Sequence, residues 1–186
     1  MTVSTTFGYN ATEDRIWMRC DAWPRRLWIT RRIALKVLQA VVQAIEGWHD
    51  ADGTPADIAE RAAAEHDAAI NRPSSEEKSP ALRMGSETAD AAPLKDAVLC
   101  TRFNMTRHSD RADLTFGAAE GEWRLQLSRT GLHRWVHALH MVINSTQWHE
   151  GITLASWLTR SYLPPALRAL LDAPPPEDGD LLDEDD

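Results

Sequence analysis

Hydrophobic and polar positions alternate in three short stretches near the N-terminus and then change to a helical spacing. Apolar residues occupy alternate positions within 6–9, 15–20 and 26–29, which is the pattern of half-buried strands. After Thr30, apolar residues recur every three or four positions as far as Gly47. The pattern therefore predicts three strands followed by a helix that Thr30 caps and that ends near Gly47.

The same order returns further along the chain. The alternation predicts strands at 102–105, 113–116 and 123–127, followed by a helix that Ser128 caps and that runs to about Asn144. Several residues of the two stretches also match in order, and the tripeptides WHD (48–50) and WHE (148–150) follow the two helices. We therefore expect an α+β fold built as a tandem duplication of a βββα unit, with the two units packed with pseudo-twofold symmetry. Trp48 and Trp148 are expected to fold back onto the core.

The remaining segments are expected to be accessory. The first unit spans 1–50 and the second spans 98–150. The insert 51–97 combines a helix, capped by Thr54 and begun by Pro55, with a disordered linker. A docking segment (151–172) and an acidic disordered tail (173–186) complete the chain.

The net charge of -8 is unevenly distributed. Residues 1–49 carry seven basic and four acidic side chains, whereas the tail 173–186 carries seven acidic side chains and none that is basic. The sequence has no apolar run long enough to span a membrane and no signal-peptide pattern. Its two cysteines form no disulfide framework, so we expect a cytoplasmic protein.

Two groups of side chains resemble metal or catalytic sites only in part. His133, His137 and His140 lie on one stripe of the second predicted helix, where they could chelate a metal, form an exposed polar stripe or pack between the units. They lack the HExxH spacing and a neighbouring thiolate or carboxylate, so no metal site is expected. His49, Asp50, His149 and Glu150 would form a second cluster only if the units brought them together, and they are more typical of helix ends. With no catalytic motif in the sequence, we expect neither an enzyme nor a cofactor.

The strands of the first unit carry arginine and tryptophan on the face opposite the apolar one. Alternation places Arg15, Trp17 and Arg19 on this face, and likewise Arg26 and Trp28. The second unit adds Arg124 but no outward tryptophan. These six residues are the predicted partner-binding set. The structural alternative is that the helix at 55–70 covers the two indoles.

Two functions are compatible with this face. The first is a non-enzymatic binding or adaptor module for a protein partner, because interfaces are enriched in tryptophan and arginine. The alternative is single-stranded nucleic-acid binding, with indoles stacking on bases and the acidic tail competing for the basic face. The general plan of strand meanders that end in a helix resembles that of PUR-type single-strand binders. A protein partner is the preferred expectation, no membrane is involved, and a homo-oligomer is compatible with the sequence.

Overall fold

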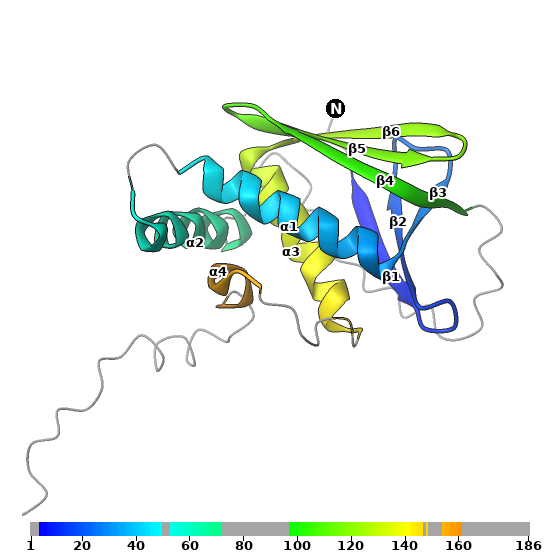
Figure 1. The fold of residues 1–186 in the computed structure, drawn as a ribbon, viewed down its shortest axis with the longest axis horizontal. Helices are drawn as coiled ribbons and strands as arrows, with labels where there is room; N and C mark the ends of the chain where they lie inside the picture. The colour runs from blue at the N-terminus through cyan, green and yellow to red at the C-terminus, as the bar shows by residue number, and fades with distance from the viewer. Residues whose placement is uncertain (1–3, 50–52, 72–96, 147, 149–153, 161–186) are drawn as a thin grey trace, which may run out of the picture.

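The computed structural model describes residues 4–49, 53–71, 97–146, 148 and 154–160. Within these residues the chain forms one sheet and four helices, so the fold is mixed α+β as predicted (Figure 1). The strands are β1 (Thr5–Asn10), β2 (Arg15–Cys20), β3 (Arg26–Ile29), β4 (Ala97–Arg107), β5 (Arg111–Ala118) and β6 (Gly121–Ser128). The helices are α1 (Arg31–Gly47), α2 (Pro55–Asn71), α3 (Arg129–Asn144) and α4 (Ser156–Arg160).

The six strands follow one another across the sheet in chain order. β1 to β3 form one antiparallel meander and β4 to β6 form a second. The two meanders meet where β3 pairs in parallel with the first residues of β4, Ala97 to Leu99. This pairing also explains why β4 begins at Ala97, five residues before the strand predicted at Arg102. Hydrophobic alternation within one strand cannot predict which distant strand will pair with it, so it could not predict this extension of β4.

The predicted pseudo-twofold relation is not confirmed. Because β3 and β4 are parallel, β4, β5 and β6 run in the same directions as β1, β2 and β3, respectively. The second meander is therefore related to the first by a shift across the sheet. The duplication itself stays a prediction, although each meander is followed by a helix in the expected order. The linker 72–96 and the tail 173–186 lie outside the described residues.

α1 and α3 begin at the predicted caps. The hydroxyl of Thr30 accepts a hydrogen bond from the backbone N–H of Ile33, and that of Ser128 accepts one from Gly131. α2 begins in the same way, because Thr54 and Asp57 exchange hydrogen bonds between backbone and side chain. These side chains satisfy N–H groups that have no partner inside a helix.

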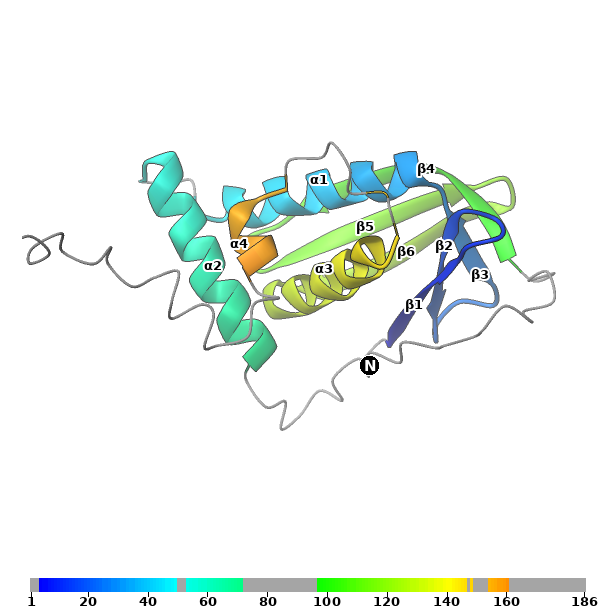
Figure 2. The same ribbon diagram turned by 90° about the horizontal axis from the view of Figure 1, so that it is seen from below.

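α1 and α3 pack on the concave side of the sheet, as Figures 1 and 2 show. Their apolar faces meet the inward residues of both meanders in one continuous core. Aromatic rings link its parts: Phe7 and Phe116 both contact Trp135, and Trp23 from the β2–β3 turn contacts Phe116. The two meanders therefore share one core.

The tryptophans of WHD and WHE make corresponding hydrogen bonds. The indole N–H of Trp48, after α1, donates to the carbonyl of His108 in the β4–β5 turn at 2.6 Å. The indole N–H of Trp148, after α3, donates to Asp14 in the β1–β2 turn at 2.7 Å. Each helix is thus followed by a tryptophan whose indole N–H donates to the first turn of the meander that does not directly precede the helix. Trp148 is buried and Trp48 partly buried against the core, so both fold back as predicted.

α2 and α4 form a further layer on the side of α3 and α1 away from β1–β3 (Figure 2). α4 buries Trp157 and Leu158. Among the described residues, no helix is long and apolar enough to cross a membrane.

Candidate functional site

The predicted tryptophan and arginine face is the outer face of β1–β3. Trp17 and Trp28 lie directly opposite each other on β2 and β3, in a row that continues to Gly8 on β1 and Leu99 on β4. Neither indole belongs to the core cluster formed by the neighbouring Ile16, Met18 and Leu27. The alternation therefore assigned the two indoles to the correct side of the sheet.

The expected exposure of these indoles is wrong. Trp17 is 7% exposed and Trp28 is 8% exposed. Gly8 provides the space for the Trp17 ring, since a Cβ on Gly8 would overlap atoms of that ring. The guanidinium of Arg26 lies 5.1 Å from the centre of the same ring, which is cation–π geometry. Trp17 is therefore enclosed by its own sheet and by an arginine that was predicted to act beside it.

The helix predicted to cover the indoles lies elsewhere. α2 packs against α1, α3 and α4, and Figures 1 and 2 both place it at the other end of the molecule from β1–β3. The alternative in which this helix shields Trp17 and Trp28 is therefore wrong.

The predicted arginines do not all lie together. Arg15 and Arg19 project from β2 beside Trp17, and Arg26 projects from β3. Arg15 is 3.8 Å from the Glu13 carboxylate and its side chain is 37% exposed. Arg124 lies on β6, in the other meander, where it pairs with Glu122 at 3.3 Å. The structure thus brings together five of the six predicted residues and separates Arg124 from them.

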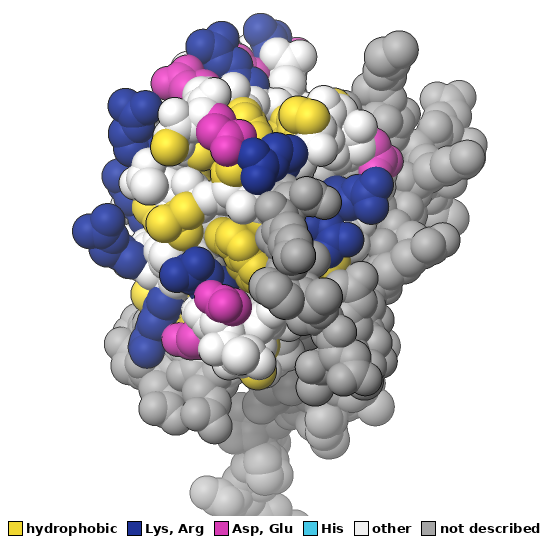
Figure 3. Space-filling model, turned by 90° about the vertical axis from the view of Figure 1, so that its right-hand side faces the viewer, with side chains coloured by type: hydrophobic (Ala, Val, Ile, Leu, Met, Phe, Trp, Pro, Cys, Tyr) yellow, Lys and Arg dark blue, Asp and Glu magenta, His cyan; other side chains and the backbone are white. Residues whose placement is uncertain are grey.

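Leu99 is a member of this surface that the sequence analysis missed. It is 40% exposed, the one large hydrophobic side chain exposed among the described residues, and it pairs with Trp28 across β3 and β4. Extending the alternation back through Val98 and Cys100 would have placed Leu99 outward. We define the outer apolar strip as Trp17, Trp28 and Leu99. Figure 3 views the molecule from this side, where hydrophobic side chains lie among Lys and Arg side chains.

The histidine series of α3 faces other helices. His133 and His140 are 0% exposed, which excludes an exposed polar stripe. His133 meets His66 of α2, with the two Nδ1 atoms 3.1 Å apart. Within the described part of the chain, no group of three His, Cys, Asp or Glu side chains is placed to hold a metal ion.

A second cluster surrounds Glu65 of α2, and the sequence analysis did not identify it. Arg129 of α3 donates to both carboxylate oxygens, Nε to Oε1 at 2.9 Å and Nη2 to Oε2 at 2.6 Å. His49 approaches Oε2 at 2.9 Å and His133 at 3.6 Å. No local pattern could have found this cluster, because its members come from the end of α1, from α2 and from α3.

The electrostatics of this cluster follow from burial and from its single carboxylate. Burial acts to raise the pKa of Glu65, but the hydrogen bonds from Arg129 and the charges of His133, Arg129 and His49 hold it below its ordinary value. Burial lowers the pKa of His133 to about 4, although Glu65 acts in the opposite direction. His133 is therefore neutral at physiological pH, where Glu65 and Arg129 form an ion pair. The expected grouping of His49 with Asp50, His149 and Glu150 cannot be compared, since the last three lie outside the described residues.

No protein-family model matches the chain, and no curated protein or solved structure is similar to it. The function must therefore be argued from the surfaces that the fold itself provides.

Proposed function

We propose that the chain is a non-enzymatic binding or adaptor module whose outer face on β1–β4 binds an acidic segment of a protein partner. The observation that carries the proposal is the exposure of Leu99 at the end of the outer apolar strip, next to the arginines of β2 and β3. A segment that places an apolar side chain on Leu99 and carboxylates on the arginines would satisfy both parts of this surface.

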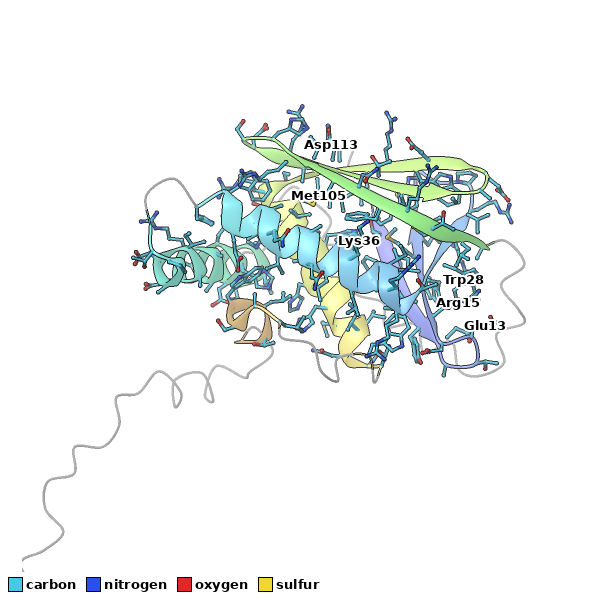
Figure 4. The ribbon with its side chains drawn as sticks, in the orientation of Figure 1. Glu13, Arg15, Trp28, Lys36, Met105 and Asp113 are labelled. Atoms are coloured by element: carbon cyan, nitrogen blue, oxygen red, sulfur yellow. The ribbon has the colours of Figure 1, made fainter. Side chains whose placement is uncertain are left out.

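The arginines support a protein partner because they surround apolar area. Arg19 is exposed, Arg15 is partly exposed, and Arg26 is held over Trp17. An arginine fixed on an aromatic ring loses little side-chain entropy when it binds a carboxylate, which favours it as an interface residue. Figure 4 labels Arg15 and Trp28 on this side of the molecule, whereas Lys36 lies apart on α1.

The structure weakens the case for single-stranded nucleic acid. That function needs indoles free to stack on bases, and both indoles of the strip are buried. The arginines alone would support only phosphate contacts. A nucleic acid is therefore an outcome to be tested against the protein partner.

The test uses a fluorescent peptide with the sequence of residues 173–186 as a probe, because it combines two leucines with seven acidic side chains. Its binding is measured by anisotropy to the full chain and to a chain that ends at Asp172. We expect the Arg15→Glu, Arg19→Glu, Arg26→Glu triple variant to weaken binding roughly 10-fold or more, and Leu99→Ser to weaken it several-fold. Lys36→Glu makes the same kind of charge change on α1 and should leave the affinity unchanged.

A second probe separates an acidic protein segment from a general polyanion. A peptide with both leucines changed to serine keeps its charge and should bind more weakly. A single-stranded oligothymidine of similar charge should bind weakly and without response to Leu99→Ser. If the oligonucleotide binds more tightly than the peptide, the nucleic-acid function replaces the one proposed. If neither probe responds to the variants of this face, the surface assignment is wrong.

A further inference from the structure

α2 is attached to the rest of the molecule mainly through ionisable side chains. Its buried residues are Ala62, Ala69 and His66. Alanine removes little apolar area from water, so these contacts contribute far less than the leucines and isoleucines that hold α1. The stability of the attachment therefore depends on the hydrogen bonds and charge interactions of Glu65 and His66.

Glu65 joins α2 to two other helices. Its carboxylate receives both hydrogen bonds from Arg129 and lies next to His49 and His133, as described above. The guanidinium of Arg129 in turn lies 4.9 Å from the centre of the Trp48 ring. Arg134 of α3 adds a hydrogen bond to the carbonyl of Ala69 at 2.7 Å, near the end of α2.

His66 and His133 form the buried centre of this attachment. Both are 0% exposed, and a hydrogen bond between Nδ1 atoms 3.1 Å apart requires one imidazole to donate and the other to accept. Because Nε2 of His133 faces the Glu65 carboxylate, Nδ1 of His133 is assigned as the acceptor and Nδ1 of His66 as the donor. A proton added at Nδ1 of His133 would place two N–H groups against each other.

The Glu65 carboxylate faces His133 of the pair. Glu65 is already shared with Arg129 and His49, so it is poorly placed to compensate a further positive charge. The pair also meets an indole and another imidazole: the ring centre of Trp157 of α4 lies 5.1 Å from that of His66 and 6.1 Å from that of His133, and the ring centre of His137 lies 5.7 Å from that of His66. Trp157 also donates to Glu46 of α1 at 3.0 Å, which links α4 to the same cluster.

We propose that α2 and α4 form an acid-released clasp, in which protonation of the His66–His133 pair detaches α2 from α3 while the sheet, α1 and α3 keep their shared core. The core cluster is built mainly from β1–β6, α1 and α3, whereas α2 contributes only Ala62 to its buried members and α4 contributes Trp157 and Leu158. Release uncovers the surfaces through which α2 and α3 contact each other. The burial that keeps His133 neutral in the closed clasp is lost on release, so acid favours the open form.

Hydrogen exchange of the full chain, measured by mass spectrometry between pH 7.5 and 4.5 in EDTA and corrected for intrinsic rates, tests the clasp. We expect amides of 55–71 to lose protection at a higher pH than amides of β4–β6 and α3. Loss of protection in all segments at one pH would instead mean global acid unfolding and would overturn the proposal. Retained protection of 55–71 down to pH 4.5 would also overturn it.

Variants show which groups carry the response. His66→Asn keeps a donor near Nδ1 but cannot titrate, so the release should move at least half a pH unit lower. His133→Asn makes the matching change on α3 and serves if His66→Asn does not fold. His108→Asn is the control, because His108 is partly buried beside Asp113 of β5, away from the clasp. A release at the wild-type pH in both clasp variants would assign the response to other groups and contradict the proposal.

Discussion

A single glycine determines how the first meander encloses its tryptophan. Gly8 lies opposite Trp17 in the β1–β2 register, and the Trp17 ring occupies the space that any other side chain at position 8 would fill. Arg26 covers the ring from β3. The ring is therefore packed although it lies on the side of the sheet opposite the core.

This packing predicts a specific coupling between two residues. Gly8→Ala should destabilise the chain by about 1–3 kcal/mol, because the added methyl group displaces the indole. In a Trp17→Ala background the same change should cost less than about 0.5 kcal/mol, since the ring is no longer there. Urea unfolding of the four chains in this cycle measures the difference. Equal penalties in both backgrounds would mean that Gly8 matters for some reason other than Trp17.

The same residues indicate what the sequence could determine at this scale. Alternation fixed the face of Arg15, Trp17 and Trp28, because successive side chains of a strand point to opposite sides. It could not determine exposure, which depends on the absent side chain of Gly8 and on Arg26 from a neighbouring strand. Leu99 could have been found by the same rule, had β4 been extended to its true beginning.

At the scale of elements, α1 and α3 are each tied to the meander that does not directly precede them. Trp48 follows β1–β3 and α1 but binds the β4–β5 turn, and Trp148 follows β4–β6 and α3 but binds the β1–β2 turn. This exchange makes the stability of each hairpin depend on the other half of the chain. It is also the relation expected of a duplicated unit whose copies fold together.

Removing either indole N–H should have a similar effect. Trp48→Phe and Trp148→Phe should each cost about 1 kcal/mol, because each keeps a ring but removes one hydrogen bond to a turn. In the Trp148 variant the Asp14 carboxylate still accepts a hydrogen bond from the Tyr9 hydroxyl. The edge-to-face contact of Trp148 with Tyr9, at 5.8 Å, should persist in the phenylalanine variant. Chemical denaturation measures both losses. A negligible loss in both variants would show that the hydrogen bonds contribute nothing and that only ring packing holds the turns.

The sequence determined the elements better than their contacts. The caps Thr30, Ser128 and Thr54 were identifiable because a cap bonds to a residue three positions away. The contact of α2 with α3 was not, since His66 and His133 lie 67 residues apart and neither belongs to a recognisable motif. His133 belonged to the series considered for a metal, but its partner proved to be another histidine and the Glu65–Arg129 pair.

For the whole molecule, these buried ionisable groups predict a loss of stability in acid. His133 has a pKa of about 4 in the folded chain and an ordinary value of 6.5 when unfolded, so below pH 6.5 the unfolded chain binds a proton that the folded chain does not. The pKa of Glu65 is also held below its ordinary value, so its contribution is lost as pH falls through the folded pKa. Both groups therefore lower the free energy of unfolding as pH falls.

The expected size of the His133 effect allows a direct measurement. Between pH 7 and pH 5, the wild-type free energy of unfolding should fall by about 2 kcal/mol more than that of His133→Asn. Urea unfolding at the two pH values gives this difference, and the slope of the transition separates its two sources. A slope that stays constant means that acid acts on the whole fold, whereas a slope that decreases means that α2 and α4 have already left the folded chain, because less surface remains to be exposed. An equal pH dependence in the two chains would show that His133 is not a source of the acid response.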